Sequence, residues 1–376
     1  MKSLVYSLVL FSLMFSCGIK NVENKKEFKL IKNHTFYSGF NSSNSQVETF
    51  GGKQYYCVGD FLSYKKIAVH GLTDSSLHFV NLKTITDLGE KVISYEIVNL
   101  DSIYILTDHT NKVFLINNKG EIQKKYDFNT DTLINKKFML MRCLTPFVFN
   151  KSTFVFGLSY RSQNREYDFN NLEEFQLKKY KAPILYKVTK GRDAIKTELG
   201  LENLYLNFID SSVFASEGRG FAFFEDKIIF VSSFSDSLYI INPENLKIIK
   251  KVKVSSKYSD ILLKPATVKE IRKDRNASNN VYGTNGMIYE IFYDKKLMLY
   301  YCFVWHKPIE NSKHRPWSII VLDEDFKKID EIKLDEEKYG CGGLMTNEGL
   351  LIYNYLNSKK DKDHFKKNTM SLFRYE

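Results

Sequence analysis

Short apolar and aromatic segments alternate with turns along most of the chain, a pattern typical of consecutive β-strands. The clearest copy has apolar segments at residues 101–108 and 112–118, a turn at Lys119 and Gly120, and a charged segment from Ile122 to Tyr126. A second copy aligns with it almost element for element, with its segments at residues 226–232, 236–242 and 246–252. The repeated unit is therefore a small antiparallel sheet.

Six copies of this unit can be followed through the sequence. Their first apolar residues are Ile67, Ile103, Phe154, Ile228, Leu297 and Leu350, at intervals of 36, 51, 74, 69 and 53 residues. A propeller blade takes about 40 to 50 residues, so the longer intervals hold insertions. The pattern predicts an all-β fold, a six-bladed β-propeller, with seven blades as the alternative count. The competing interpretation is a pair of β-sandwiches or one irregular sheet.

The two ends of the chain complement each other. The last copy has strand-like segments at 350–355 and 369–375 and then stops one strand short of a four-stranded blade. A segment near the start, either 28–31 or 34–40, can supply the missing outer strand. We therefore expect an N-terminal strand to close the last blade, because such pairing removes the exposed edges of an open ring.

The N-terminus resembles a bacterial lipoprotein signal. Lys2 provides the positive start, residues 4–15 form an apolar core too short to span a bilayer, and the small Ser16 precedes Cys17. We predict lipidation at Cys17; an uncleaved anchor and ordinary secretion are the alternatives. The predicted organisation is a signal peptide over residues 1–16, a lipidated tether over 17–29 and a single β-propeller domain over 30–376.

Charge indicates which partners to expect. The formal net charge is +11, from 55 Lys and Arg interleaved with 44 Asp and Glu. Because these charges form no basic stripe and accompany no nucleic-acid-binding motif, we expect no nucleic-acid partner. A lysine-rich surface is compatible with anionic lipid headgroups, and the lipid on Cys17 would make the membrane itself a partner.

No segment carries a recognisable catalytic or metal-binding motif. The sequence has no phosphate-binding or dinucleotide-binding glycine pattern, and its seven histidines are dispersed. The remaining cysteines are too scattered to form a metal framework; disulfides are permitted, and none is expected to be catalytic: Cys57, Cys143, Cys302 and Cys341. We therefore expect no catalytic residue, no metal and no cofactor.

Propellers bind ligands in the central channel or in the loops at its mouth, since a rigid ring positions both. The innermost strand of each blade should precede the first apolar residue of each copy. This places a set of candidate ligand-binding residues at the channel: Tyr55, Tyr56, Arg142, Arg219, Tyr282 and Asn285, with Cys341 near them. Each of them has packing or a turn as its alternative role.

The chain resembles the Bacteroidetes lipoproteins of unassigned function that have a TolB-like, six-bladed propeller. The resemblance covers most of the mature chain and rests on Cys17, the six strand repeats, and the segments 234–239 and 293–301. It implies no catalytic residues. Members of this class often carry an acidic export signal after the cysteine, whereas residues 18–23 are only weakly acidic, so periplasmic and cell-surface orientations both stay open.

These observations favour a binding or scaffold propeller without catalytic activity, held at the outer membrane, with a cell-envelope protein or glycan as its ligand. The alternative is a carbohydrate hydrolase or lyase. That activity requires two carboxylates facing each other in the channel, about 5 to 10 Å apart.

Overall fold

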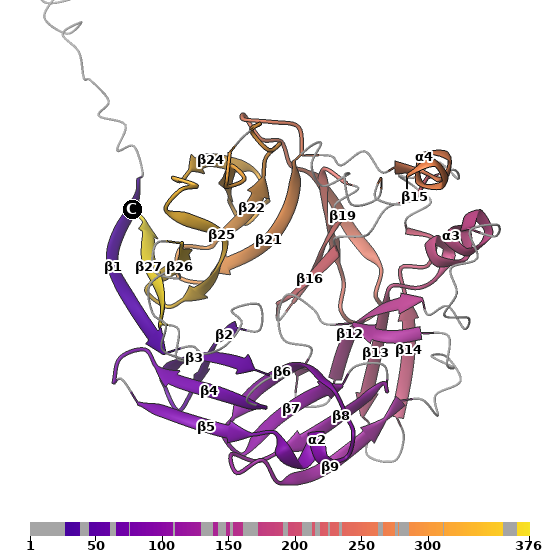
Figure 1. Cartoon of the computed structure of the whole chain (residues 1–376), viewed down its shortest axis with the longest axis vertical. Coiled ribbons are helices and arrows are strands. Elements are labelled where there is room, and N and C mark those ends of the chain that lie inside the picture. Colours follow the sequence, from indigo (N-terminus) through magenta and orange to yellow (C-terminus); the bar gives the residue numbers. More distant parts are fainter. Residues whose placement is uncertain are drawn as a thin grey trace, which may run out of the picture.

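Six antiparallel sheets arranged in a ring, five of four strands and one of five, make up the described part of the protein, which we describe from a computed structural model (Figure 1). The described residues are 27–37, 45–60, 65–74, 76–107, 110–128, 138–141, 148–150, 153–160, 172–190, 195–204, 213–214, 219–224, 226–232, 235–261, 266–274, 277, 286–310, 312–355 and 367–376. The prediction of a six-bladed β-propeller is confirmed. Among these residues no helix has the length and apolar character needed to cross a membrane.

Each blade is an antiparallel meander that runs from the ring axis to the rim. Blade 1 contains β2 (Ser45–Phe50), β3 (Lys53–Asp60), β4 (Lys66–Gly71) and β5 (Leu77–Asn81). Blade 2 contains β6 (Val92–Asn99), β7 (Ser102–Thr107), β8 (Lys112–Ile116) and β9 (Ile122–Asp127). Blade 3 contains β10 (Phe138–Met141), β12 (Thr153–Tyr160), β13 (Leu185–Lys190) and β14 (Ile195–Gly200), with the short β11 (Val148–Asn150) also paired to β12.

The second half of the ring repeats this order. Blade 4 contains β16 (Arg219–Phe223), β17 (Ile228–Ser232), β18 (Ser237–Ile241) and β19 (Ile248–Lys253). Blade 5 contains β21 (Met287–Asp294), β22 (Leu299–Trp305), β23 (Trp317–Leu322) and β24 (Lys328–Lys333). Blade 6 contains β25 (Tyr339–Thr346), β26 (Gly349–Asn354), β27 (Lys367–Tyr375) and β1 (Phe28–Tyr37).

A few elements lie outside the blades. Helix α2 (Lys83–Asp87) connects blades 1 and 2. Helices α3 (Leu172–Lys181) and α4 (Val268–Lys273) lie at the periphery of the ring, as does the small sheet of β15 (Val213–Phe214) and β20 (Ala266–Thr267) (Figure 1). A capping box on Thr267 and Glu270 fixes the start of α4.

The hydrophobic core is divided among six seams, one between each pair of neighbouring blades. Side chains alternate between the faces of a strand, so a middle strand supplies two seams at once. In β17, Ile228 and Phe230 pack toward blade 3, whereas Ile229 and Val231 pack toward blade 5. This two-sided burial explains why the middle strands are apolar at successive positions and do not alternate with polar residues.

The N-terminal strand closes the ring, as predicted. Strand β1 pairs with β27 from Phe28 opposite Tyr375 to Tyr37 opposite Lys367, so blade 6 takes strands from both ends of the chain. The Phe28 and Phe373 rings stack at 4.9 Å. Strand β1 begins at Phe28, two residues before the predicted start of the domain at residue 30.

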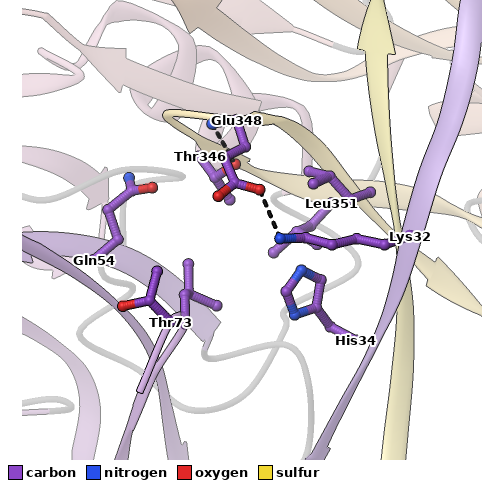
Figure 2. A pocket seen from close by; sticks show the side chains of 9 residues that line it. Lys32, His34, Gln54, Thr73, Thr346, Glu348 and Leu351 are labelled. Carbon is purple, nitrogen blue, oxygen red and sulfur yellow. Dashed lines mark hydrogen bonds and ion pairs between the residues drawn. The ribbon is translucent and has the colours of Figure 1, made fainter. Parts of the chain in front are cut away.

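A small cavity lies at the seam between blades 6 and 1, on the side of the ring where the turns β2–β3 and β25–β26 are found (Figure 2). The Lys32 ammonium lies 2.7 Å from the Glu348 carboxylate at its edge. Burial and the neighbouring lysine lower the pKa of His34, which also lines the cavity. Both ion-pair side chains are more than two-fifths exposed, so the pair contributes little to closure compared with the apolar seam.

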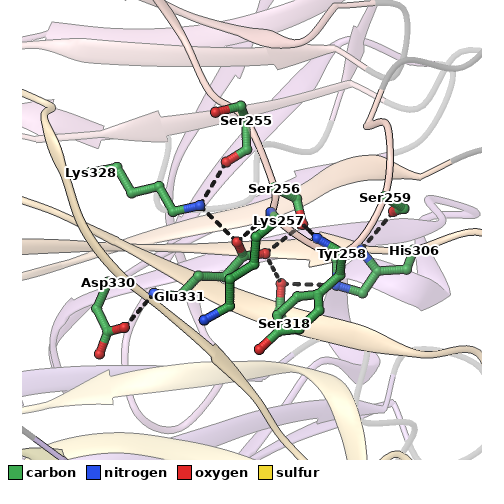
Figure 3. A network of polar contacts seen from close by, with 10 residues as sticks. All are labelled: Ser255, Ser256, Lys257, Tyr258, Ser259, His306, Ser318, Lys328, Asp330 and Glu331. Carbon is green, nitrogen blue, oxygen red and sulfur yellow. Dashed lines mark hydrogen bonds and ion pairs between the residues drawn. The ribbon is translucent and has the colours of Figure 1, made fainter.

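A buried carboxylate fastens the connection between blades 4 and 5 (Figure 3). Glu331 on β24 accepts hydrogen bonds from the Lys257 backbone N–H and from the Ser256 hydroxyl, at 2.7 and 2.5 Å, and from Lys328 Nζ at 2.7 Å. It also accepts one from Ser318 Oγ on β23, at 2.8 Å. The charge is therefore compensated and hydrogen-bonded, which a buried carboxylate requires.

His306 extends this network to Ser259. Its Nε2 lies 2.9 Å from Ser318 Oγ and its Nδ1 lies 2.8 Å from Ser259 Oγ. Ser318 uses its only hydrogen for Glu331, so it must accept from Nε2–H. Burial lowers the pKa of His306 to about 4, so the imidazole is neutral at pH 7 and its Nδ1 accepts from the Ser259 hydroxyl.

We expect the stability of the protein to decrease as the pH falls from about 6.5 to 4. The pKa of His306 is lower in the folded chain than in the unfolded chain, so its contribution is fully present above 6.5 and is lost through its folded pKa of about 4. The loss is roughly 3 kcal/mol at most, at 1.36 kcal/mol per pKa unit. Chemical unfolding of the wild type and of His306→Gln between pH 4.5 and 7.5 measures it. The difference in unfolding free energy between the wild type and His306→Gln should shrink as the pH falls. Unfolding free energies that run parallel over this pH range would contradict the lowered pKa of His306.

Candidate functional site

An aromatic stack occupies one mouth of the channel, on the face where the innermost strands begin. The Tyr289 ring on β21 lies 4.5 Å from the Trp305 ring at the end of β22, with an interplanar angle of 22°. The Arg315 guanidinium, in the β22–β23 connection, lies 5.1 Å from the Trp305 ring and donates from Nε to the His306 carbonyl at 2.6 Å. Tyr289 remains 36% exposed, so a fixed aromatic ring is presented to solvent beside the axis.

A glycine in the neighbouring blade lies against this arrangement. Gly342 on β25 has φ of +122°, a region that L-residues rarely adopt, and the pairing of β25 with β26 is irregular between Tyr339 and Gly343. A Cβ atom at Gly342 would lie 3.5 Å from the Tyr289 ring and 3.6 Å from Glu290 Oε2, which are ordinary van der Waals distances. The backbone conformation, and not the available space, therefore favours glycine at this position.

The cluster continues into blade 1. Tyr353 on β26 lies near the same Gly342 position, and its hydroxyl is hydrogen-bonded to the Ser45 hydroxyl at the start of β2. Burial raises the pKa of Tyr353 well above its usual value, so its hydroxyl keeps its proton. We name the set Ser45, Tyr289, Glu290, Gly342 and Tyr353 the axial cluster. It combines an exposed aromatic ring, a carboxyl group and three hydroxyls from three blades around a buried glycine.

A second carboxyl group lies on the other side of β2. Glu48 keeps some access to solvent, but the protein surrounds it closely enough that burial raises its pKa to about 8. It therefore carries a proton at neutral pH. Gln46, two residues earlier on the same face, donates to the Tyr95 carbonyl at 2.7 Å, while its Oε1 is buried and has no hydrogen-bond partner among the described residues. Perturbed carboxyl groups of this kind are frequent at functional sites.

The acidic residues of the innermost strands point into different seams. Glu48 lies on the face of β2 that packs on blade 2, and Glu290 lies against Gly342 of blade 6. Glu96 on β6 interacts with Tyr104, toward blade 3. This arrangement differs from the facing carboxylate pair that glycoside hydrolysis requires. Within the described part of the chain, no three His, Cys, Asp or Glu side chains are positioned to hold a metal ion.

Two of the candidate residues named from the sequence pack between blades. Tyr55 and Tyr56 lie on β3, the second strand of blade 1, because Ile67 belongs to the third strand and not to the second. Tyr56 is fully buried and stacks on Phe36 at 4.2 Å, while Tyr55 stacks on Phe50 at 4.1 Å. Both contribute to the seams of blade 1.

The other candidates are placed only in part. Arg219 opens β16, an innermost strand as expected, although its side chain lies outside the described set. Cys341 lies on the innermost strand β25 as a free thiol, and burial raises its pKa well above its usual value. Arg142, Tyr282, Asn285 and Cys17 lie outside the described residues.

Sequence reasoning missed the members of the axial cluster. The sequence did contain one signal for them. Tyr289 and Glu290 interrupt the otherwise apolar residues of the strand segment 287–292. The positive φ of Gly342 and the irregular strand pairing beside it have no equivalent signal in the sequence.

Comparisons with known proteins agree with the fold. The sequence profile of a family described as a domain of unknown function, DUF4221, matches residues 87–333. A member of that family from Bacteroides vulgatus has a solved structure with a TM-score of 0.66, 17% identity, and coverage of 94% of this chain and 99% of its own. A putative exported protein from Bacteroides fragilis has a TM-score of 0.44 at 11% identity, covering 96% of this chain and 98% of its own. A search of curated sequences finds no match.

Replacing Glu48 by Gln should stabilise the protein increasingly as the pH rises. The folded pKa of about 8 exceeds the unfolded value of 4.5, so the wild type loses stability between these two pH values, whereas Gln does not titrate. The difference reaches roughly 5 kcal/mol at most, at 1.36 kcal/mol per pKa unit. Urea unfolding of both proteins at pH 5, 7 and 9 tests this, and a difference that is constant with pH would contradict a protonated Glu48.

Proposed function

The chain belongs to the DUF4221 family, a domain family of unknown function. We propose that it is a non-catalytic binding module of the cell envelope, with a glycan as its ligand. The observation that carries the proposal is the Tyr289–Trp305–Arg315 stack at the channel mouth.

The chemistry of the axial cluster suits a sugar. The C–H face of a pyranose ring packs on a flat aromatic side chain, and its hydroxyls need both donors and acceptors around that ring. Tyr289 offers the aromatic surface, Glu290 an acceptor, and Tyr353 a hydroxyl. Binding sites generally combine such apolar surfaces with a few well-placed polar groups.

The stack is also held in place before any ligand arrives. Trp305 and Arg315 support Tyr289 from one side, and the Arg315 hydrogen bond to the His306 carbonyl fixes the guanidinium. The ring of blades provides the rigid frame. A ligand therefore meets side chains with little conformational entropy left to lose, which favours binding.

The N-terminal signal supports a position at the envelope. In the proposed mature protein, lipid on Cys17 holds the chain at the outer membrane, and residues 18–26 connect that lipid to β1 at Phe28. Strand β1 is the outermost strand of blade 6, so the anchor leaves the ring at its rim. This position leaves the channel mouth accessible to a ligand.

Substituting Tyr289 by Ala should weaken glycan binding by about tenfold, as loss of one stacking surface of about 1.4 kcal/mol predicts. Wild type and variant are compared on a glycan microarray and against peptidoglycan and outer-membrane polysaccharide. Tyr258→Ala, which removes a tyrosine 43% exposed on the β19–β21 connection, is the matched control and should bind like the wild type. Binding unaffected by Tyr289→Ala, or recovery of an envelope protein alone, would refute the glycan proposal.

Replacing Cys17 by Ala should abolish lipid attachment and release the protein from the membrane fraction. A single myristoyl-sized chain binds a membrane with an association constant of only about 10⁴ M⁻¹, so stable attachment depends on several acyl chains at one anchor. Loss of that anchor therefore removes nearly all membrane affinity. Metabolic labelling with an alkyne fatty acid, followed by fractionation, measures both effects. Cys341→Ala, which removes a partly buried thiol, should keep the label. Label that persists without Cys17 would contradict the assignment.

A further inference from the structure

One of the six rim strands differs from the others in charge. The outermost strands β1, β9, β14, β19 and β24 all carry lysine, and most carry acidic residues as well. Strand β5, with the sequence Leu-His-Phe-Val-Asn, carries no Lys, Arg, Asp or Glu. Lysine on an edge strand opposes pairing with other chains, so β5 is the one rim strand without this protection.

The apolar side chains of β5 are exposed. Phe79 is 53% exposed and Leu77 is 39% exposed, although the neighbouring Val80 is buried in the seam with blade 2. The Lys66 Nζ atom lies 5.8 Å from the centre of the Phe79 ring. An exposed phenylalanine on an unprotected edge marks an interaction surface.

The backbone of the same residues faces outward. The Gly71 N–H donates to the Ser76 carbonyl and the Leu82 N–H donates to the Lys65 carbonyl, each at 2.8 Å. Hydrogen-bonded pairs alternate along an antiparallel ladder, so the residues of β5 bonded to β4 are His78 and Val80. The N–H and C=O groups of Leu77 and Phe79 therefore point away from blade 1, as do those of Asn81, whose carbonyl oxygen lies against Gly120 of blade 2.

We propose that β5 pairs with β5 of a second copy of this chain, forming a two-fold symmetric dimer through the rim of blade 1. In such a contact each residue near the axis meets its own copy, so a charged strand would repel itself. Strand β5 alone among the rim strands avoids this repulsion.

The ends of the strand also favour a second copy as the occupant. Antiparallel pairing centred on Phe79 places Leu77 opposite Asn81 of the other copy. It also places the Asp74 end of one strand beside the Lys83 end of the other. Asp74 is held in its charged form by hydrogen bonds from Lys53 and Ser76, which lower its pKa. The lysines at Lys83 and Lys65 consequently face an acidic group and not each other.

A cysteine at position 79 tests the geometry directly. Directly opposed residues of a hydrogen-bonded antiparallel pair have Cα atoms about 5.5 Å apart, a separation that suits a disulfide. Cells expressing Phe79→Cys are oxidised and analysed on a non-reducing gel. Ile249→Cys is the matched control, because Ile249 is 62% exposed on the lysine-rich rim strand β19. Phe79→Cys should give at least about fivefold more linked dimer than Ile249→Cys, as favourable disulfide geometry predicts.

Sedimentation velocity of the purified chain provides the second measurement. Phe79→Lys introduces the self-repelling charge and should raise the dissociation constant of the dimer about tenfold or more. Ile249→Lys should leave it unchanged. A purified wild type that stays monomeric together with equal cross-linking of both cysteine variants would overturn the proposal, as would a Phe79→Cys adduct with a different protein. Neither result bears on glycan binding at Tyr289.

Discussion

Apolar packing between neighbouring blades is the interaction on which the rest of this structure depends. No blade can bury its own residues, because a four-stranded sheet has two faces and no second layer within the blade. Each of the six hydrophobic clusters therefore takes its members from two blades, and the middle strands contribute to two clusters each. Such an arrangement is stable only when every blade has two neighbours, which requires the ring to close.

Closure explains the unusual position of the N-terminus. Strand β1 completes blade 6, and Phe36 of that strand packs in the seam with blade 1 beside Tyr56. The ends of the chain are thus tied together by a full antiparallel ladder, while the exposed Lys32–Glu348 ion pair adds little. In the seam between blades 4 and 5, the buried Glu331 holds the long connection between these blades through backbone and side-chain hydrogen bonds.

The same geometry creates two different kinds of surface. The innermost strands converge at the axis, where Tyr289, Glu290 and Tyr353 lie around Gly342, and the positive φ of that residue favours glycine. The outermost strands diverge at the rim and expose their edges. Lysine protects most of these edges, and the uncharged β5 is the exception. We therefore propose ligand binding at the axis and association between chains at the rim.

How far the sequence leads differs between the fold and the site. Blade repeats were visible because middle strands are almost continuously apolar, as the buried strands β17 and β18 show. The one misplaced register was in blade 1, where β2 has the polar sequence Ser-Gln-Val-Glu-Thr-Phe and gives no strand signal of its own. As a result Tyr55 and Tyr56 were expected at the channel, whereas they pack between blades.

By itself the sequence predicted six blades, their order and an N-terminal strand that closes the ring, because these follow from local periodicity and from counting strands at both ends. Only the tertiary structure decided which side chains meet at the axis. Ser45 and Tyr353 are hydrogen-bonded although 308 residues separate them. Such contacts depend on ring closure, on the face to which each alternating side chain points and on the irregular pairing at Gly342, and none of these is encoded in a short stretch of sequence.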